Sequence, residues 1–280
     1  MARRSLLDRH PLAVFSAVTY ALSWTCWLVW SALPGRPTLR TVAFVLGGFG
    51  PFFAATLLTA LSGESVRAWL GRVFRFRVAP RYYAVALGLP VVALGLAGLT
   101  HWAVLGGTLT PESLPSPLEY PIILALVLLF GGGQEEPGWR GYLLPRLQEE
   151  HSSLRAALVV GVVWAAWHAP LFVLPGAIQN DIAPWLYLPQ VVAMSVVLTW
   201  LTNVSRGSVL PAMLLHAGGN AVVNFYPVGG AAGAVATTGY ALLAAVVAVA
   251  AIAVTVWKGP SLGATTRETP RDPPVAETGG

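Results

Sequence analysis

The stretch Gly239–Trp257 reads GYALLAAVVAVAAIAVTVW and contains no charged residue. A second stretch, Tyr82–Leu105, reads YYAVALGLPVVALGLAGLTHWAVL and has the same character. A helix of about 20 apolar residues matches the thickness of the hydrocarbon layer of a bilayer. Since lipid offers no hydrogen-bond partners, a chain that crosses it must pair its backbone groups internally, as a helix does. These stretches therefore indicate membrane-spanning helices.

The composition of the whole chain supports the same class of protein. Of its 280 residues, 55% are hydrophobic and 10% are charged, and the mean hydropathy is +0.65. A soluble domain carries about 25% charged residues, so this chain has too little charge to cover a water-facing surface. The lone Cys26 allows no disulfide framework. The net charge of +5 comes without a nucleic-acid-binding motif, so nucleic acid is not an expected partner.

Glycine and proline residues divide the chain into its predicted helices. We expect an all-α, polytopic membrane bundle of about eight transmembrane helices, formed by residues 1–257 as a single transmembrane domain. The segment 64–80 carries too much charge to span and is expected to lie along the interface. The segment 258–280 is expected to be a disordered cytoplasmic tail. The predicted spans are 11–33, 42–62, 80–106, 118–146, 154–174, 185–203, 208–226 and 231–257.

The basic residues of the predicted loops indicate an orientation. With the N-terminus in the cytoplasm, all but three of the 17 basic residues fall in cytoplasmic loops or tails. Arg36 and Arg40 fall outside, and Arg140 lies within a span. Because short loops rich in Lys and Arg stay in the cytoplasm, we expect a multi-pass protein of the cell membrane with both termini cytoplasmic. The first apolar block lacks a small-residue cleavage site, so no cleaved signal peptide is expected.

Three predicted spans contain ionisable or strongly polar side chains. Such groups are costly within a bilayer and usually face the interior of a bundle, so each is a candidate functional residue. They are Glu135, Glu136 and Arg140 in the fourth span (GGGQEEPGWRGYLLPRLQ, 131–148), His168 in the fifth (WAAWHAPLF, 164–172), and His216 and Asn220 in the seventh (LLHAGGNAVVN, 214–224).

The spacing within the fourth span predicts an ion pair next to a break in the helix. Glu136 and Arg140 are four residues apart, so on a helix they share a face and can pair. Pro137 disfavours helical geometry at the residue before it. We therefore expect a break near Gly131–Gly133, with Pro137 in the first turn of a resumed helix; irregular backbone at this depth is tolerated where it lines a wet cavity.

The candidate residues of the three spans fall at similar depths. At 1.5 Å per residue from the cytoplasmic ends, Glu135 lies roughly 15–20 Å deep, His168 roughly 20 Å and His216 roughly 12 Å. His216 and Asn220 are four residues apart and can point into one cavity. Taken singly, these groups could be a structural ion pair, a core histidine and interhelical hydrogen bonds. Their common depth favours one shared site, to which His10, His101 and His151 are not expected to belong.

The three motifs resemble those of the CPBP (CAAX protease and Abi) family of intramembrane proteases, which includes the type II CAAX prenyl endopeptidase. The family pattern EExxxR matches EEPGWR at 135–140, and HxxxN matches HAGGN at 216–220. The pattern FxxxH appears as WAAWH at 164–168, with Trp164 in place of Phe. Order and spacing agree over about 130–225, which marks residues 118–226 as the catalytic half. The exchange of one aromatic residue for another at Trp164 is expected to alter packing and not chemistry.

The resemblance implies an intramembrane endopeptidase that hydrolyses a peptide bond of a membrane-associated protein or peptide, including one with a lipidated, CAAX-like end. It also implies a role for each candidate residue. Glu135 activates water, His168 supports it, Glu136 pairs with Arg140 to hold the geometry, and His216 and Asn220 stabilise the oxyanion.

The participation of a metal and the function class stay open at this stage. Glu135, His168 and His216 make up the two-histidine, one-carboxylate set of catalytic zinc sites, so Zn²⁺ is a candidate cofactor. No HExxH helix is present, and we favour a metal-free glutamate mechanism. One alternative is a non-proteolytic immunity or scaffolding membrane protein of the same fold. Another is a proton-coupled transporter, for which inverted repeats would be expected and are not found.

Overall fold

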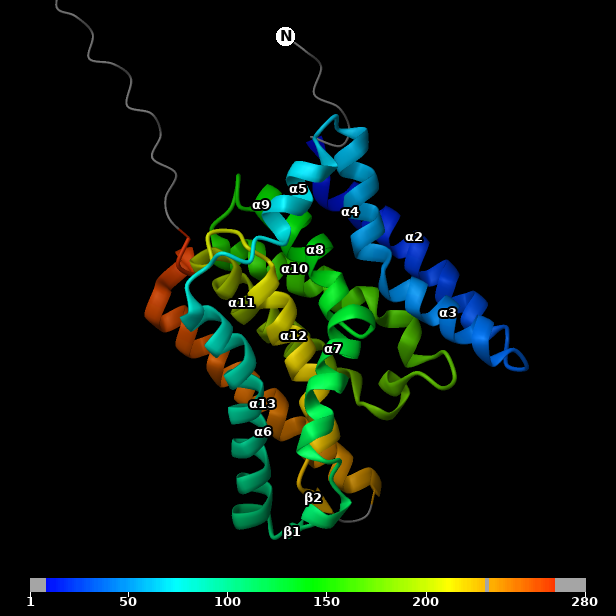
Figure 1. Ribbon diagram of the computed structural model, residues 1–280, viewed down its shortest axis with the longest axis vertical. Coiled ribbons are helices and arrows are strands. Elements are labelled where there is room, and N and C mark those ends of the chain that lie inside the picture. The colour runs from blue at the N-terminus through cyan, green and yellow to red at the C-terminus, as the bar shows by residue number, and fades with distance from the viewer. Residues whose placement is uncertain (1–8, 230–231, 265–280) are drawn as a thin grey trace, which may run out of the picture.

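The computed structural model describes residues 9–229 and 232–264, which form a bundle of helices (Figure 1). Two short strands, β1 (Thr108–Leu109) and β2 (Val228–Gly229), pair antiparallel at one end. The helices are α2 (Pro11–Ser31), α3 (Pro37–Gly48), α4 (Gly50–Leu61), α5 (Val66–Val73), α6 (Pro80–Leu105), α7 (Tyr120–Phe130), α8 (Glu136–Gly138), α9 (Leu144–Leu147), α10 (Ser153–Trp167), α11 (Pro184–Val204), α12 (Leu210–Val222) and α13 (Ala232–Lys258).

Helical segments occur at all eight predicted spans, and the all-α membrane fold is confirmed. By length and composition, five of the described helical segments can cross a membrane, and a sixth results if α3 and α4 count as one bent span. The fifth and seventh predicted spans form the shorter helices α10 and α12. Proline at the first or second position starts many of these helices, because its fixed φ suits a helix start and its missing N–H is not needed there.

The second predicted span, 42–62, is not one straight helix. It begins earlier, at Pro37, and α3 and α4 meet at a bend of 53° at Phe49. Pro51 lies in the first turn of α4 and has no backbone N–H, so one intrahelical hydrogen bond is missing at the bend. The bend lets α4 cross α8 closely. A Cβ on Gly138 would lie 2.4 Å from the backbone oxygen of Pro51, so only glycine allows this approach.

The turns that carry most of the arginines lie on one side of the molecule, at the top of Figure 1. Arg75 donates a hydrogen bond to the backbone oxygen of Ser205 at 3.0 Å, which joins the α5–α6 connection to the α11–α12 turn. Arg146 forms an ion pair with Glu64, which joins α9 to the α4–α5 connection. The structure therefore gathers these basic turns on one face, and the cytoplasmic placement of that face stays a prediction.

The interface segment and the start of the predicted tail are both ordered where the structure describes them. Residues 66–73 of the predicted interface segment form α5. The predicted tail starts at residue 258, but Leu262 is fully buried and its backbone oxygen accepts a hydrogen bond from Asn203 at 3.3 Å. The boundary of the packed domain therefore moves past residue 258, and residues 265–280 lie outside the described part of the chain.

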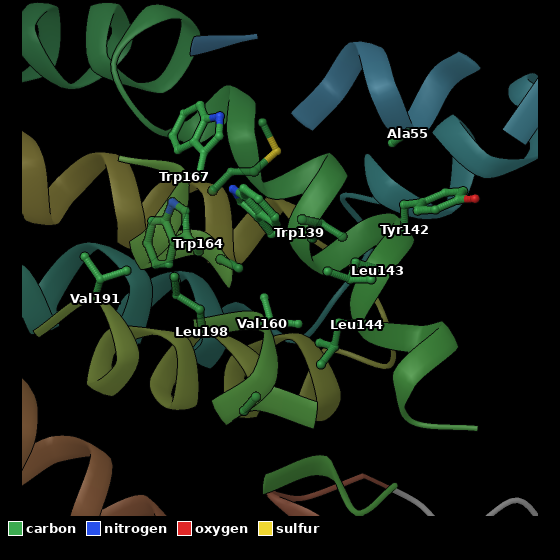
Figure 2. Packing of buried hydrophobic residues seen from close by; sticks show 14 of the residues in the cluster. Ala55, Trp139, Tyr142, Leu143, Leu144, Val160, Trp164, Trp167, Val191 and Leu198 are labelled. Carbon is green, nitrogen blue, oxygen red and sulfur yellow. The ribbon is translucent and has the colours of Figure 1, made fainter. Parts of the chain in front are cut away.

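A cluster of aromatic rings fills the core between α2, the helical turn at Trp139–Leu143 and α10. The rings of Phe15 and Trp139 lie 5.4 Å apart, those of Trp139 and Trp167 6.0 Å, and those of Trp167 and Trp27 4.7 Å. Figure 2 shows Trp139, Trp164 and Trp167 side by side among buried aliphatic residues. Offset and edge-on aromatic pairs add stability beyond the area they bury, so this cluster gives the helices that carry the polar residues a well-packed support.

Candidate active site

The fourth predicted span is broken where its polar residues begin. Helix α7 ends at Phe130, and Gly132 has φ +146°, a conformation that favours glycine. A short turn at Gly133–Glu135 leads into α8, with Pro137 in its first turn. The predicted break near 131–133 is confirmed. A π-helical turn at Trp139–Leu143, which the sequence did not predict, follows directly and carries Arg140.

Glu136 lies at the centre of a buried group of charges. Its side chain is fully buried, and Arg140 Nη1 lies 3.1 Å from both of its carboxylate oxygens. The Nδ1 atom of His216, from α12, lies 2.8 Å from Glu136 Oε1. Glu136 therefore pairs with Arg140 within the fourth span and, through His216, joins this span to α12.

Glu135 has a different set of contacts from its neighbour. Its Oε2 atom accepts a hydrogen bond from the indole Nε1 of Trp164 at 2.8 Å. In the described part of the chain, no group hydrogen-bonds to its other oxygen, Oε1. Glu135 also lines a cavity, whereas Glu136 does not. One oxygen of this carboxylate is therefore held by the protein, and the other is left for a molecule in the cavity.

His168 caps the C-terminal end of α10, and one of its ring nitrogens hydrogen-bonds to the backbone. Its Nδ1 lies 2.9 Å from the backbone oxygen of Trp164. Because a carbonyl oxygen can only accept, Nδ1 carries the proton in this hydrogen bond. The ring packs edge-on against Trp167 at 4.8 Å and Tyr187 at 5.1 Å between centroids. These contacts fix the ring and leave Nε2 as an acceptor at the cavity.

His216 and Asn220 converge on the glycine at the break. A Cβ on Gly132 would lie 2.8 Å from His216 Nε2 and 2.7 Å from Asn220 Nδ2. Asn220 Nδ2 also donates a hydrogen bond to the backbone oxygen of Gly131 at 2.9 Å, which orients its amide. Two nitrogens thus flank the space that the missing side chain of Gly132 leaves.

The candidate residues fall into two groups around one cavity of about 920 Å³. Glu135, His168, His216 and Asn220 line it, and we call them the cavity-facing group. Glu136 and Arg140 are 0% and 1% exposed, do not line it, and are called the buried pair. Most other lining residues are apolar, and α11 and α13 supply the largest share of them. Such a cavity, apolar with a few converging polar groups, is the usual form of a ligand site.

The three candidate zinc ligands all line the cavity, but their side chains are not placed to bind one metal ion together. Across residues 9–229 and 232–264, no group of three His, Cys, Asp or Glu side chains is placed to hold a metal ion. Glu135 Oε2 is engaged with Trp164, and His216 Nδ1 with Glu136. As placed here, Glu135, His168 and His216 do not fit a three-ligand zinc site.

Two residues at the site were missed or misjudged from the sequence. The expectation that Trp164 alters packing and not chemistry left out a contact, because its indole N–H donates a hydrogen bond to Glu135. Gln134 lines the cavity, and its Oε1 accepts a hydrogen bond from the backbone N–H of Gly132 at 2.8 Å, which supports the break. A signal for Gln134 was present, since it is a polar residue within a predicted span.

His101 does not line the cavity but touches a residue that does. Its Nδ1 lies 3.0 Å from the hydroxyl oxygen of Tyr226, which is a lining residue. His10 and His151 are likewise not among the lining residues. The site is therefore built around His168 and His216.

Comparison with known proteins identifies the same half of the chain. Residues 117–222 match the family model of the Rce1-like type II CAAX prenyl endopeptidases. A CAAX prenyl protease 2 from the archaeon Methanococcus maripaludis is 23% identical over 212 residues, which cover 71% of this chain and 78% of the relative. The matched segment contains every residue of the cavity-facing group and the buried pair. Over residues 117–222 the chain is thus similar to the type II CAAX prenyl endopeptidases, and this similarity supports its assignment to the CPBP family.

Proposed function

We propose that this chain is an intramembrane endopeptidase in which Glu135 activates a water molecule for attack on a peptide bond. The observation that carries the proposal is the cavity-facing group, in which one carboxylate, two imidazoles and one amide surround a single cavity. The family supports the reaction class. The apolar lining supports a membrane-associated substrate, including a protein with a lipidated, CAAX-like end.

The free oxygen of Glu135 and the free nitrogen of His168 suit the first step. Glu135 Oε1 removes a proton from water, and the resulting hydroxide adds to the carbonyl carbon of the scissile bond. His168 Nε2 accepts the second hydrogen of the same water and so orients it. A base must lie within hydrogen-bond reach of the proton that it removes, and both groups line the cavity that would hold the water.

His216 and Asn220 suit the charge that develops on the substrate carbonyl oxygen. Donors placed in advance where negative charge appears make one of the greatest contributions to catalysis. The space beside Gly132 lies within hydrogen-bond distance of His216 Nε2 and Asn220 Nδ2. Because His216 Nδ1 already faces Glu136, donation from Nε2 requires a proton on both ring nitrogens.

The second step returns the proton to the leaving group. The tetrahedral intermediate collapses, the C–N bond breaks, and protonated Glu135 gives its proton to the leaving amine. The Glu135 carboxylate is then restored for the next cycle. The buried pair takes no part in proton transfer and holds the broken span and His216 in place.

The proposal is tested with the full chain in lipid nanodiscs. Peptides with a farnesylated CAAX-like end are compared with unlipidated peptides of the same sequence. We expect Glu135→Gln to lower the cleavage rate by about 10²–10⁴-fold, with an unchanged melting temperature. Glu150→Gln, which alters an exposed glutamate, is the matched control and should cleave like wild type.

Two outcomes would contradict the proposed function. Cleavage that survives Glu135→Gln would remove the glutamate mechanism. Failure of the wild-type protein to cleave any peptide of a diverse library would favour a non-proteolytic immunity or scaffolding protein. Cleavage of both peptide forms at equal rates would retain the endopeptidase and remove the lipidated substrate.

A further inference from the structure

Trp164 contacts more of the candidate residues than any other side chain at the site does. Its Nε1 donates to Glu135, and its backbone oxygen accepts from His168 Nδ1. The Arg140 guanidinium lies over its ring at 4.7 Å from the centroid. The His216 ring meets it edge-on at 5.0 Å. Trp164 thus touches both the cavity-facing group and the buried pair.

The hydrogen bond from Trp164 determines how the Glu135 carboxylate is presented. A carboxylate side chain that lines a cavity can rotate about its last torsion, since terminal sp³–sp² torsions are broad. The bond of 2.8 Å to Oε2 restrains this rotation. Hydrogen bonds to an ionised acceptor are about twice as strong as those between neutral groups. Oε1 is then the oxygen that remains for water.

The indole itself is buried and packed against Arg140 and His216, so it can act as a rigid donor. Trp164 is 3% exposed. Its ring is enclosed by Arg140 on one face and by the edge of His216. A catalytic group must stay within about 0.5 Å of its productive position, and residues locked by packing provide that precision. A hydrogen bond from so rigid a donor therefore fixes the orientation of the Glu135 carboxylate.

We propose that Trp164 is a positioning residue that orients Glu135 so that Oε1, and not Oε2, faces the bound water. This inference rests on the proposed role of Glu135 as the base. Trp164 stands where the FxxxH pattern has Phe, so its indole N–H adds a donor that phenylalanine lacks. Removing the donor should lower the rate of the chemical step and leave substrate binding intact.

The test is Trp164→Phe, which keeps an aromatic ring and removes the N–H. We expect kcat to fall by roughly 10- to 100-fold, the range for loss of a hydrogen bond to a charged group, with KM little changed. Trp139→Phe is the matched control, because Trp139 is equally buried and, among the described residues, its Nε1 has no hydrogen-bond partner. A kcat for Trp164→Phe no lower than that of Trp139→Phe would overturn the inference.

A second variant separates loss of the hydrogen bond from loss of volume. Trp164 is replaced by benzothienylalanine, in which sulfur takes the place of the N–H and the bicyclic shape is kept. We expect the same fall in kcat as for Trp164→Phe. A wild-type kcat in this variant would assign the effect to packing and overturn the inference.

A stability cycle tests the contact without any substrate. We expect Trp164→Phe to lower the melting temperature less in a Glu135→Ala background than in wild type, because the hydrogen bond is already lost there. Equal shifts in both backgrounds would overturn the inference. The failure of the proposed function can be told apart from the failure of this inference. If the Glu135→Gln variant still cleaves, the proposed function fails. If Glu135→Gln is inactive and the melting-temperature shifts are additive, only the role of Trp164 fails.

Discussion

The cavity-facing group and the buried pair contain neighbouring glutamates with opposite surroundings. Glu135 has one oxygen on Trp164 and one free at the cavity, whereas Glu136 is enclosed by Arg140 and His216. The two side chains are chemically identical and adjacent in sequence. The difference therefore comes from the helices packed around them, which leave one carboxylate at the cavity and enclose the other.

The comparison also explains why the two groups need each other. His216 belongs to the cavity-facing group, yet its Nδ1 is fixed by Glu136 of the buried pair. Arg140 in turn packs on Trp164, which holds Glu135. His216 is thus held by the buried pair directly, and Glu135 is held by a residue that packs against that pair. Changes in the buried pair should mainly lower stability, and changes at the cavity should mainly lower the rate.

Arg140→Ala should have the largest effect on stability. It leaves the fully buried Glu136 without its cation, and breaking a buried pair on one side lowers the free energy of unfolding by about 3–5 kcal/mol. The measurement is thermal or denaturant unfolding in detergent. Arg146→Ala is the matched control, because the Arg146–Glu64 pair is partly exposed and such pairs contribute about 0–1 kcal/mol.

A double variant sharpens this prediction. Replacing both partners with neutral residues of similar size, Glu136→Gln with Arg140→Met, should destabilise less than Arg140→Ala alone, because no unpaired charge stays buried. If Arg140→Ala and Arg146→Ala lower the stability equally, the buried pair does not support the site as described.

Gly132→Ala should have a smaller effect on stability and a clear effect on rate. The new methyl group would lie within 3 Å of His216 Nε2 and Asn220 Nδ2, where we place the oxyanion. Removing one such donor lowers kcat by about 10²–10³-fold, and blocking the space between two should do at least that. Gly88→Ala is the control, because a Cβ there meets no atom within 4 Å. Equal cleavage rates in the two variants would show that the oxyanion does not lie beside Gly132.

The sequence predicted the features of the site that depend on local spacing. The helix break near Gly131–Gly133, the position of Pro137 and the Glu136–Arg140 pair all follow from residues within ten positions of one another. The membrane class and the places of the helices follow from apolar blocks that lipid requires. Local patterns sufficed there because each feature is decided within one segment.

The features that the sequence did not predict depend on contacts between separate helices. The Trp164–Glu135 hydrogen bond joins residues 29 positions apart, and the His216–Glu136 contact joins residues 80 apart. Which oxygen faces the cavity is decided by how α10 and α12 pack on the broken span. The 53° bend between α3 and α4 likewise serves the close crossing at Gly138. A single sequence lacks the relative placement of helices on which these contacts depend.

Chelation should have the smallest effect of all. If the cavity-facing group works through its own protons, treatment with EDTA should leave the cleavage rate unchanged, and purified protein should contain less than one zinc ion per chain. This expectation follows from the absence, in the described residues, of three side chains placed as metal ligands. A zinc protease in the same buffer serves as the positive control. Loss of cleavage that Zn²⁺ alone restores would mean that Glu135, His168 and His216 gather around a metal, and would replace the water-activating carboxylate with a metal-bound water.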